Sequence, residues 1–247
     1  MKNHFITSYF GNKREEVEKI YEVIKDAKNI KYIIECYCGS CAISYYISTI
    51  HPKKYKYILN DNNKFLVELL EIMKDENKYN LWIEEINKIF ELIVDKESYL
   101  KYTNKNTLNG WFIGNKYYNI RPFLYPTNKK ITKLTDDYPI INFLRNEDIT
   151  ILNKDGLEVF NTYCNDKNSL LFIDPPYLLA NNSFYKTPGI EIYEYLTNIK
   201  KYKSKIICAL GDNFIIRLIF KNNKIIEYDK KYQTTKKTLK HLIITNF

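Results

Sequence analysis

The most chemically distinctive part of the chain is the run of four residues Asp174, Pro175, Pro176 and Tyr177. It directly follows the apolar run 170–173, which is typical of a buried strand. Two consecutive prolines fix the backbone and remove two N–H donors, so the segment must leave the strand as a stiff loop. Ligands of open α/β sheets bind at the carboxyl ends of the strands. The spacing therefore predicts a functional loop at Asp174.

The residue types of this loop suit a substrate that carries an amino group. The Asp174 carboxylate and the neighbouring carbonyls are acceptors, and the prolines offer no competing N–H. Tyr177 offers a flat face on which a base stacks. An adenine amino group that donates its hydrogens to Asp174 and to the Pro175 carbonyl would become pyramidal, with its lone pair available. Such a nitrogen could attack a methyl sulfonium directly, without a covalent enzyme nucleophile.

Two shorter motifs also follow apolar runs. The segment Glu35-Cys36-Tyr37-Cys38-Gly39-Ser40-Cys41 comes after the run 31–35, and its glycine lets a backbone approach a ligand closely. The three cysteines offer metal ligation as an alternative, but that site needs a fourth ligand and no second close pair of cysteines exists.

The second motif is Asn60-Asp61-Asn62, which ends the run 57–60. An acid at the tip of the second strand commonly holds ribose hydroxyls in nucleotide-binding folds. The alternative is an N-cap for the following helix, a role that Asn62 or Asn63 can also fill.

These motifs need a scaffold, and the hydrophobic patterns supply one. Periodic apolar positions predict helices over 13–27, 40–50, 64–74, 78–95, 191–202 and 213–220. Apolar runs predict strands over 31–35, 57–60, 149–152, 170–173, 205–210 and 241–245. Alternation of strand and helix predicts a parallel α/β sheet.

The segment 97–146 interrupts this alternation and is rich in tyrosine, asparagine and lysine. Its interleaved aromatic and basic residues suit stacking on bases and pairing with phosphates. The alternative is a polar subdomain whose aromatic residues form a core of their own, and the sequence leaves both open.

Composition limits the class of protein. A chain of 247 residues with 38 Lys+Arg and 29 Asp+Glu has a formal charge of +9, which favours a polyanionic partner. Its lysines also reflect a composition typical of an A/T-rich genome, such as that of a virus or a bacterium. Five cysteines do not form a disulfide scaffold, and a reducing, intracellular location is expected. No run approaches the length of a membrane span, and residues 1–5 lack the apolar core of a signal peptide.

Four blocks, in order, make the chain resemble the Dam-like, D12-class DNA adenine-N6 methyltransferases. Ser8–Arg14 is similar to that family's aromatic-x-Gly-Gly-Lys segment, with Tyr9 and Lys13 in the matching places. The blocks at 35–41 and 60–62 are similar to the family's S-adenosylmethionine loop and to its Asp-x-Asn ribose motif, and the Asp174 loop completes the series.

The resemblance implies a Rossmann-like, mostly parallel α/β sheet of seven strands, formed by residues 1–96 and 147–247. It implies a target-recognition subdomain at 97–146. The implied activity is methyl transfer from S-adenosylmethionine to N6 of adenine in double-stranded DNA, on a base flipped out of the helix. No metal and no membrane partner are implied, and the location is cytoplasmic or wherever the DNA resides.

The resemblance also assigns roles residue by residue. The catalytic residues are Asp174, Pro175, Pro176 and Tyr177. The cofactor-binding residues are Tyr9, Lys13, Glu35, Tyr37, Gly39, Asp61, Asp155 and Asp174. The nucleic-acid-binding residues are Lys116, Tyr118, Asn119 and Arg121, the last three lying in a stretch similar to the family's Phe-Asn-Val-Pro.

Two alternatives remain open from the sequence. Related Pro-Pro-Tyr loops act on RNA adenine, cytosine N4 or glutamine amides, so the substrate can differ. A non-catalytic nucleic-acid-binding subunit is the other, because Asn12 and Cys41 replace two glycines of the family pattern. The oligomeric state and a partner subunit are left open.

Overall fold

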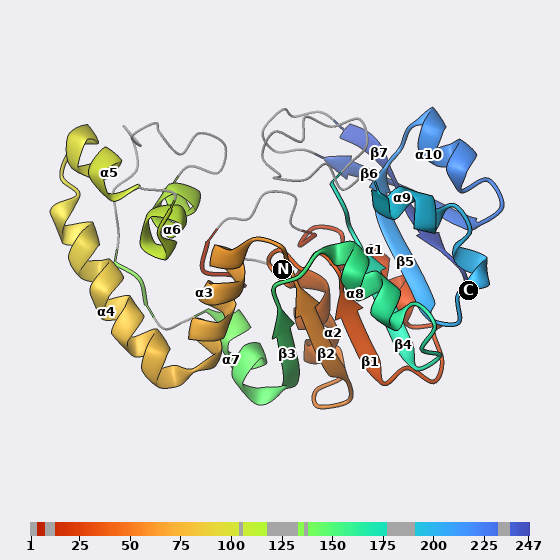
Figure 1. The fold of residues 1–247 in the computed structure, drawn as a ribbon, viewed down its shortest axis with the longest axis horizontal. Coiled ribbons are helices and arrows are strands. Elements are labelled where there is room, and N and C mark those ends of the chain that lie inside the picture. The colour runs from red at the N-terminus through yellow and green to blue at the C-terminus, as the bar shows by residue number, and fades with distance from the viewer. Residues whose placement is uncertain are drawn as a thin grey trace.

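The structure is a computed structural model, and it describes residues 4–7, 13–103, 106–117, 133–135, 138–176, 191–231 and 238–247. Among these residues, one seven-stranded sheet in the order β3-β2-β1-β4-β5-β7-β6 organises the chain (Figure 1). The strands are β1 (Tyr32–Glu35), β2 (Lys56–Asn60), β3 (Asp148–Leu152), β4 (Ser169–Ile173), β5 (Lys205–Gly211), β6 (Lys224–Lys231) and β7 (Thr238–Thr245).

Strand directions match the prediction of a mostly parallel sheet. β1 pairs in parallel with β2 and β4, and β3 and β5 extend the parallel part on either side. β7 is antiparallel to both β5 and β6, so β6 runs in the same direction as β5. The predicted Rossmann-like α/β fold is confirmed.

The helices flank the sheet or stand beside it. They are α1 (Val17–Ile24), α2 (Ala42–Ile50), α3 (Lys64–Lys74), α4 (Glu76–Leu92), α5 (Lys96–Tyr102), α6 (Leu108–Tyr117), α7 (Pro139–Asn146), α8 (Gly156–Tyr163), α9 (Glu191–Leu196), the 3₁₀ turn η1 (Ile199–Lys201) and α10 (Phe214–Ile219). None of the helices that the structure describes is long and apolar enough to cross a membrane.

Alternating strand residues build two apolar layers. Ile33 packs into a cluster with α1, α2, α3 and α7, whereas the next residue, Ile34, packs into a second cluster with α8, α9 and α10. Successive side chains of a strand point to opposite faces, so each strand contributes to both clusters. The sheet is therefore covered on both sides, and its loops are left to carry polar chemistry.

The predicted insertion divides in space. Figure 1 shows α4, α5 and α6 together beside α3, away from the sheet. The helix α7, at the end of the same segment, packs on the sheet domain instead. The ring of Phe143 lies 6.1 Å from that of Tyr45 on α2 and 5.2 Å from that of Tyr57 on β2, between ring centroids.

Three differences from the predicted elements have physical causes. The predicted helix 13–27 begins only at Val17, because residues 14–16 form turns in which the Glu16 N–H donates to the Lys13 carbonyl at 2.9 Å. The strand β6 was not predicted, because it lies at the edge of the sheet and most of its residues are polar. The short helix α8 was not predicted either, because it begins at a glycine.

Candidate active site

The strand order reverses between β1 and β4, and a ligand site of a doubly wound sheet lies at such a switch point. The loops that leave these two strands lie side by side, since the Cys36 N–H donates to the Phe172 carbonyl at 3.2 Å. One loop carries Tyr37 and Gly39, and the other carries Asp174. The fold thus brings the 35–41 segment and the Asp174 loop, two of the four predicted blocks, to one place.

Lys13 and Asp174 form a buried ion pair at this switch point. The Lys13 ammonium donates to Oδ2 of Asp174, with 5% and 16% of the two side chains exposed. Burial raises the pKa of Asp174, and the Lys13 charge opposes that rise by favouring the carboxylate. None of the described residues donates to Oδ1 or to the Pro175 carbonyl. Within the described part of the chain these two oxygens are therefore left as acceptors, and their predicted contact with an amino group stays a prediction.

Glu35 lies beneath the cofactor loop. Its Oε1 accepts the Ser44 N–H in the first turn of α2 at 2.8 Å, and the residue is almost fully buried. Burial raises the pKa of this carboxyl to about 7, against the hydrogen bonds from Ser44. Its predicted cofactor contact stays a prediction, while the structure gives it a second task, which is to join the end of β1 to the start of α2.

Asp61 is more engaged than the sequence suggested. Asn63 caps α3, as one of the two alternatives had it, by accepting the N–H groups of Phe65 and Leu66. Yet Asp61 is not free, because its Oδ2 accepts the Gly39 N–H at 3.1 Å and its Oδ1 accepts the Asn63 N–H at 3.0 Å. Each oxygen keeps a second lone pair. Asp61 thus fixes the glycine of the cofactor loop, and its ribose contact stays a prediction.

Asn60 begins the Asn60-Asp61-Asn62 motif, but no role was predicted for its side chain. Its side-chain amide donates to the carbonyls of Cys36 at 2.9 Å and Lys154 at 3.1 Å, and its oxygen accepts the Lys154 N–H at 3.0 Å. One buried amide therefore ties together the loops that follow β1, β2 and β3. Its position as the last residue of an apolar run was the available signal.

Asp155 also has a structural task. Its carboxylate accepts the Leu157 N–H at 2.7 Å and caps α8, so the predicted contact with the cofactor's adenine stays a prediction. The neighbouring Gly156 is packed against the ring of Tyr37, which is largely buried. Burial raises the pKa of the Tyr37 hydroxyl, which therefore stays protonated. The ring forms one wall between the loops after β1 and β3.

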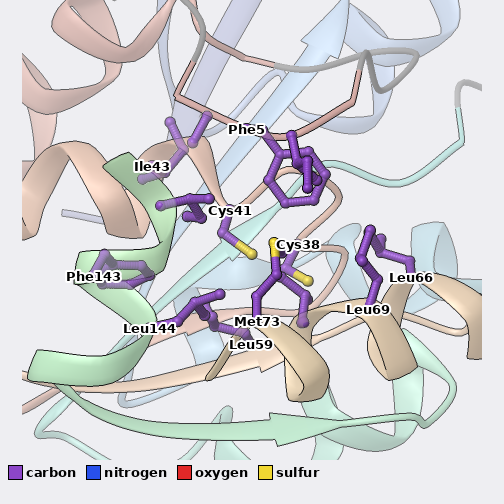
Figure 2. Close-up of a cluster of buried hydrophobic side chains, with 14 of the residues drawn as sticks. Phe5, Cys38, Cys41, Ile43, Leu59, Leu66, Leu69, Met73, Phe143 and Leu144 are labelled. Carbon is purple, nitrogen blue, oxygen red and sulfur yellow. The ribbon is translucent and has the colours of Figure 1, made fainter. Parts of the chain in front are cut away.

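The three cysteines of the 35–41 segment do not converge, because only Cys38 and Cys41 lie together. Cys36 belongs to the cluster with α8 and α9, whereas Cys38 and Cys41 belong to the cluster with α2 and α3 on the other face. Figure 2 shows Cys38 and Cys41 among apolar side chains of α2, α3 and α7. No group of three or more His, Cys, Asp or Glu residues in the described part of the chain is arranged to hold a metal ion.

Cys41 adopts a backbone conformation that favours glycine. Its φ of 54° lies in the left-handed region, as does the φ of 48° at Gly39. Its side chain is fully buried in the apolar cluster, and so it does not project into the space above the loop. The Cys41 side chain therefore packs into the core under the loop.

The predicted nucleic-acid residues are only partly described. Tyr118, Asn119 and Arg121, together with Tyr9 and Tyr177, lie outside the described residues. Lys116 is described, and its ammonium donates to the Ile6 carbonyl at 3.1 Å and to the Tyr138 hydroxyl at 3.4 Å. Burial lowers the pKa of Lys116 to about 8. The ammonium thus points at the chain itself, and its predicted phosphate contact stays a prediction.

The switch point of the Rossmann-like sheet brings together three buried carboxylates, one ammonium and a loop with positive φ. This arrangement is typical of α/β proteins that bind a nucleotide-like ligand. The family model of D12 class N6 adenine-specific DNA methyltransferases matches residues 9–121, and this confirms the resemblance seen in the sequence over that range. The chain is a methyltransferase, and S-adenosylmethionine is the cofactor that this match implies.

Two solved structures illustrate the similarity of fold. The precorrin-6y C5,15-methyltransferase of Geobacter metallireducens GS-15 is 10% identical, with 99% of this chain and 94% of that chain covered and a TM-score of 0.46. The rRNA methyltransferase aviRa of Streptomyces viridochromogenes is also 10% identical, with 100% and 91% covered and a TM-score of 0.43. No curated protein matches the sequence of this chain.

Proposed function

We propose that the chain transfers a methyl group from S-adenosylmethionine to N6 of adenine in double-stranded DNA. The observation that carries this proposal is the carboxylate of Asp174. Lys13 holds its Oδ2, while none of the residues that the structure describes donates to its Oδ1 or to the Pro175 carbonyl. Two neighbouring acceptors match the two hydrogens of one exocyclic amino group.

The charge of the site suits a cationic cofactor. Glu35, Asp61 and Asp174 are buried together, and burial raises the pKa of each. Lys13 brings a positive charge to these three carboxylates. S-adenosylmethionine, when bound, supplies an electrophilic methyl group on a positively charged sulfonium. A cation there would stabilise the three carboxylates in their ionised form.

The chain's own residues then act on the amino group. Asp174 Oδ1 and the Pro175 carbonyl accept its two hydrogens and hold the nitrogen lone pair toward the methyl carbon. S-adenosylmethionine, when bound, would supply the methyl group to this nitrogen, and its sulfur would keep the electron pair of the broken C–S bond. The methylated nitrogen then loses one proton, which passes along its hydrogen bond to Asp174 and on to water. Lys13 keeps Asp174 an acceptor throughout by favouring its ionised form.

DNA as the substrate is supported by the family model and by the net charge of +9. We infer that residues 97–146 recognise the target, with Tyr118, Asn119 and Arg121 as the predicted contacts. Lys116 was also predicted as a contact, but its ammonium donates to the Ile6 carbonyl and to the Tyr138 hydroxyl. The packing of α7 on α2 and β2 supports assigning residues 139–146 to the catalytic domain instead. A target base inside a duplex must rotate out to reach Asp174.

The test is transfer of labelled methyl from S-adenosylmethionine to unmethylated duplex DNA, with a matched RNA in parallel. Asp174→Ala is the test variant, and Asp166→Ala, at a turn before β4, is its control. Label on adenine N6 of DNA that is lost only in Asp174→Ala supports the proposal. Label only on RNA would replace the substrate, and absence of S-adenosylmethionine binding would favour a non-catalytic subunit.

A further inference from the structure

A second buried cluster of charged groups lies behind the Asp174 loop. The Glu16 carboxylate, with 3% of the side chain exposed, accepts the Lys230 ammonium at 2.6 Å. It also accepts the hydroxyl of Tyr228, and the Nδ1 atom of His241 lies 4.0 Å from it. A carboxylate buried this deeply is unusual unless it is paired. The proposed transfer reaction gives none of these four residues a role.

The sheet explains why these side chains meet. Tyr228 and Lys230 are two residues apart on β6, so both point to the same face. His241 on β7 is the register partner of Tyr228 and therefore shares that face. This is the face covered by α1, and Glu16 lies directly before α1. The β6–β7 pair thus presents a cation and a phenol to the start of the first helix.

A short path connects this cluster with the proposed catalytic carboxylate. Glu16 donates its backbone N–H to the Lys13 carbonyl at 2.9 Å, within one turn of chain. From that turn the Lys13 ammonium reaches Asp174. The same turn therefore carries the Glu16 side chain, which pairs with β6, and the Lys13 side chain, which pairs with the loop after β4.

We propose that Glu16 is a positioning residue of the transfer reaction. By pairing with Lys230 and Tyr228, Glu16 anchors the turn 13–16 and so holds Lys13 against Asp174. This inference rests on the proposed function, because Asp174 is taken as the group that accepts the amino hydrogens. Glu16 itself touches neither cofactor nor substrate in this scheme.

The charged groups of this cluster and those of the Lys13–Asp174 pair alternate in sign, and each affects the pKa of its neighbours. Glu16 faces Lys13 from its own turn, Tyr228 and Lys230 from β6, His241 from β7 and Asp174 from the loop after β4. Asp174 also faces Glu35 of β1, and His241 also faces Asp212 after β5. Burial lowers the pKa of His241 to about 4, so the imidazole is neutral near pH 7.

The direction of each charge on Asp174 follows from its sign. Burial raises the pKa of Asp174, the Lys13 and Lys230 charges lower it, and the Glu16 charge raises it. Burial also opposes ionisation of Glu16, yet Lys13 and Lys230 keep its pKa below the ordinary value. With Lys13 in place, loss of the Glu16 charge alone would move the titration of Asp174 to lower pH. In the proposed role the loss also releases Lys13, whose charge and hydrogen bond act on Asp174 more strongly than Glu16 does, so the titration moves to higher pH. Loss of the Lys230 charge moves it in the same direction.

The experiment compares Glu16→Gln and Lys230→Gln with Glu227→Gln, a control on β6 whose carboxylate also pairs with two cations but is exposed. We expect kcat to fall about tenfold in the two test variants, because a misplaced group costs rate. The acidic limb of the kcat profile should move up in pH for both variants, whereas a Glu16 that acted on Asp174 by its charge alone would move the limb down in Glu16→Gln. Lys230→Arg should restore both kcat and the limb.

A second readout separates this inference from the proposed function. Carbon-13 NMR of the Asp174 carboxyl, without substrate, should show the same upward displacements whichever substrate the enzyme uses, and a downward displacement in Glu16→Gln would overturn the inference. If the wild-type chain methylates adenine but Glu16→Gln matches Glu227→Gln in kcat, profile and NMR titration, the inference is overturned alone. If adenine is not methylated but the NMR displacements occur, the inference survives and the function fails. Should Glu16→Gln not fold, the Lys230→Gln and Lys230→Arg pair decides.

Discussion

The ring of Tyr37 lies directly on the backbone of Gly156, so close that a Cβ atom at Gly156 would stand 2.3 Å from Cζ of the ring. No real Cβ atom tolerates that contact, so the ring or the start of α8 must move when a side chain is added. Tyr37 belongs to the predicted cofactor loop, and Gly156 opens the helix after β3. The contact therefore couples the loops of two strands.

Gly156→Ala should lower the affinity for S-adenosylmethionine by about tenfold or more, which corresponds to about 1.4 kcal/mol. The displaced Tyr37 ring changes the wall of the proposed pocket. Isothermal calorimetry would measure the affinity. The double variant Gly156→Ala with Tyr37→Leu should regain thermal stability, because the smaller side chain removes the clash, without regaining affinity. Wild-type affinity in Gly156→Ala would contradict this reading of the pocket.

Asn60→Ala should reduce the free energy of unfolding by about 3 kcal/mol, because it removes three buried hydrogen bonds and leaves their backbone partners unsatisfied. Urea denaturation followed by fluorescence measures the change. Asn63→Ala removes only the cap of α3 and should cost about 1 kcal/mol. Equal losses in the two variants would show that the three loops do not depend on Asn60.

The affinity for S-adenosylmethionine should rise between about pH 5.5 and 7.5. The raised pKa of Glu35, about 7, means that this carboxyl is largely protonated in the free protein below neutrality. A cationic ligand binds better once the carboxylate is ionised. Calorimetry across this range would detect the rise, and Glu35→Gln should flatten it. A flat profile in the wild-type protein would separate Glu35 from the cofactor.

The same carboxyl has an opposite effect on the stability of the ligand-free protein. Its pKa is raised on folding, so the folded protein binds more protons than the unfolded chain between the ordinary glutamate pKa and about 7. Stability contributed by Glu35 is therefore present at low pH and is lost as the pH rises through 7. The difference in melting temperature between wild type and Glu35→Gln should follow this course.

Lys116 shows the reverse behaviour. Burial lowers its pKa to about 8, so the unfolded chain binds more protons than the folded protein above that pH. The free energy of unfolding should rise between about pH 8 and 10 in the wild type relative to Lys116→Met. The same variant should leave DNA affinity within about twofold of wild type, whereas Arg121→Met should weaken it. A large loss of DNA binding in Lys116→Met would instead support its predicted phosphate contact.

The sequence predicted those parts of the fold whose side chains carry a clear pattern. The apolar runs at β1 and β4 are bounded by turn residues, and α3 begins and ends where its periodicity does, at Lys64 and Lys74. β6 escaped prediction because only Tyr228 is fully buried along it. An edge strand meets solvent on one side, and its alternation is consequently weak.

The sequence predicts those site residues whose type is required by the chemistry. It does not predict those whose type is required by packing. Asp174 stands out because two prolines follow it. Asn60 and Gly156 do not, since their roles depend on contacts between loops that are distant in sequence. Glu16 reads as an ordinary acid near the start of a helix, and only its partners on β6 show otherwise.

The hydrogen bonds that Tyr228 and Lys230 donate to Glu16 also limit the order in which the chain can fold during synthesis. Glu16 and Lys230 are 214 positions apart, so the turn that carries Lys13 is made early and its anchor is made late. At translation rates of 5–20 residues per second, the early turn waits roughly 10 to 40 seconds for its partners. A nascent chain can therefore complete much of its sheet before Lys13 is fixed on Asp174, and methyl transfer would begin only when the last strands have docked.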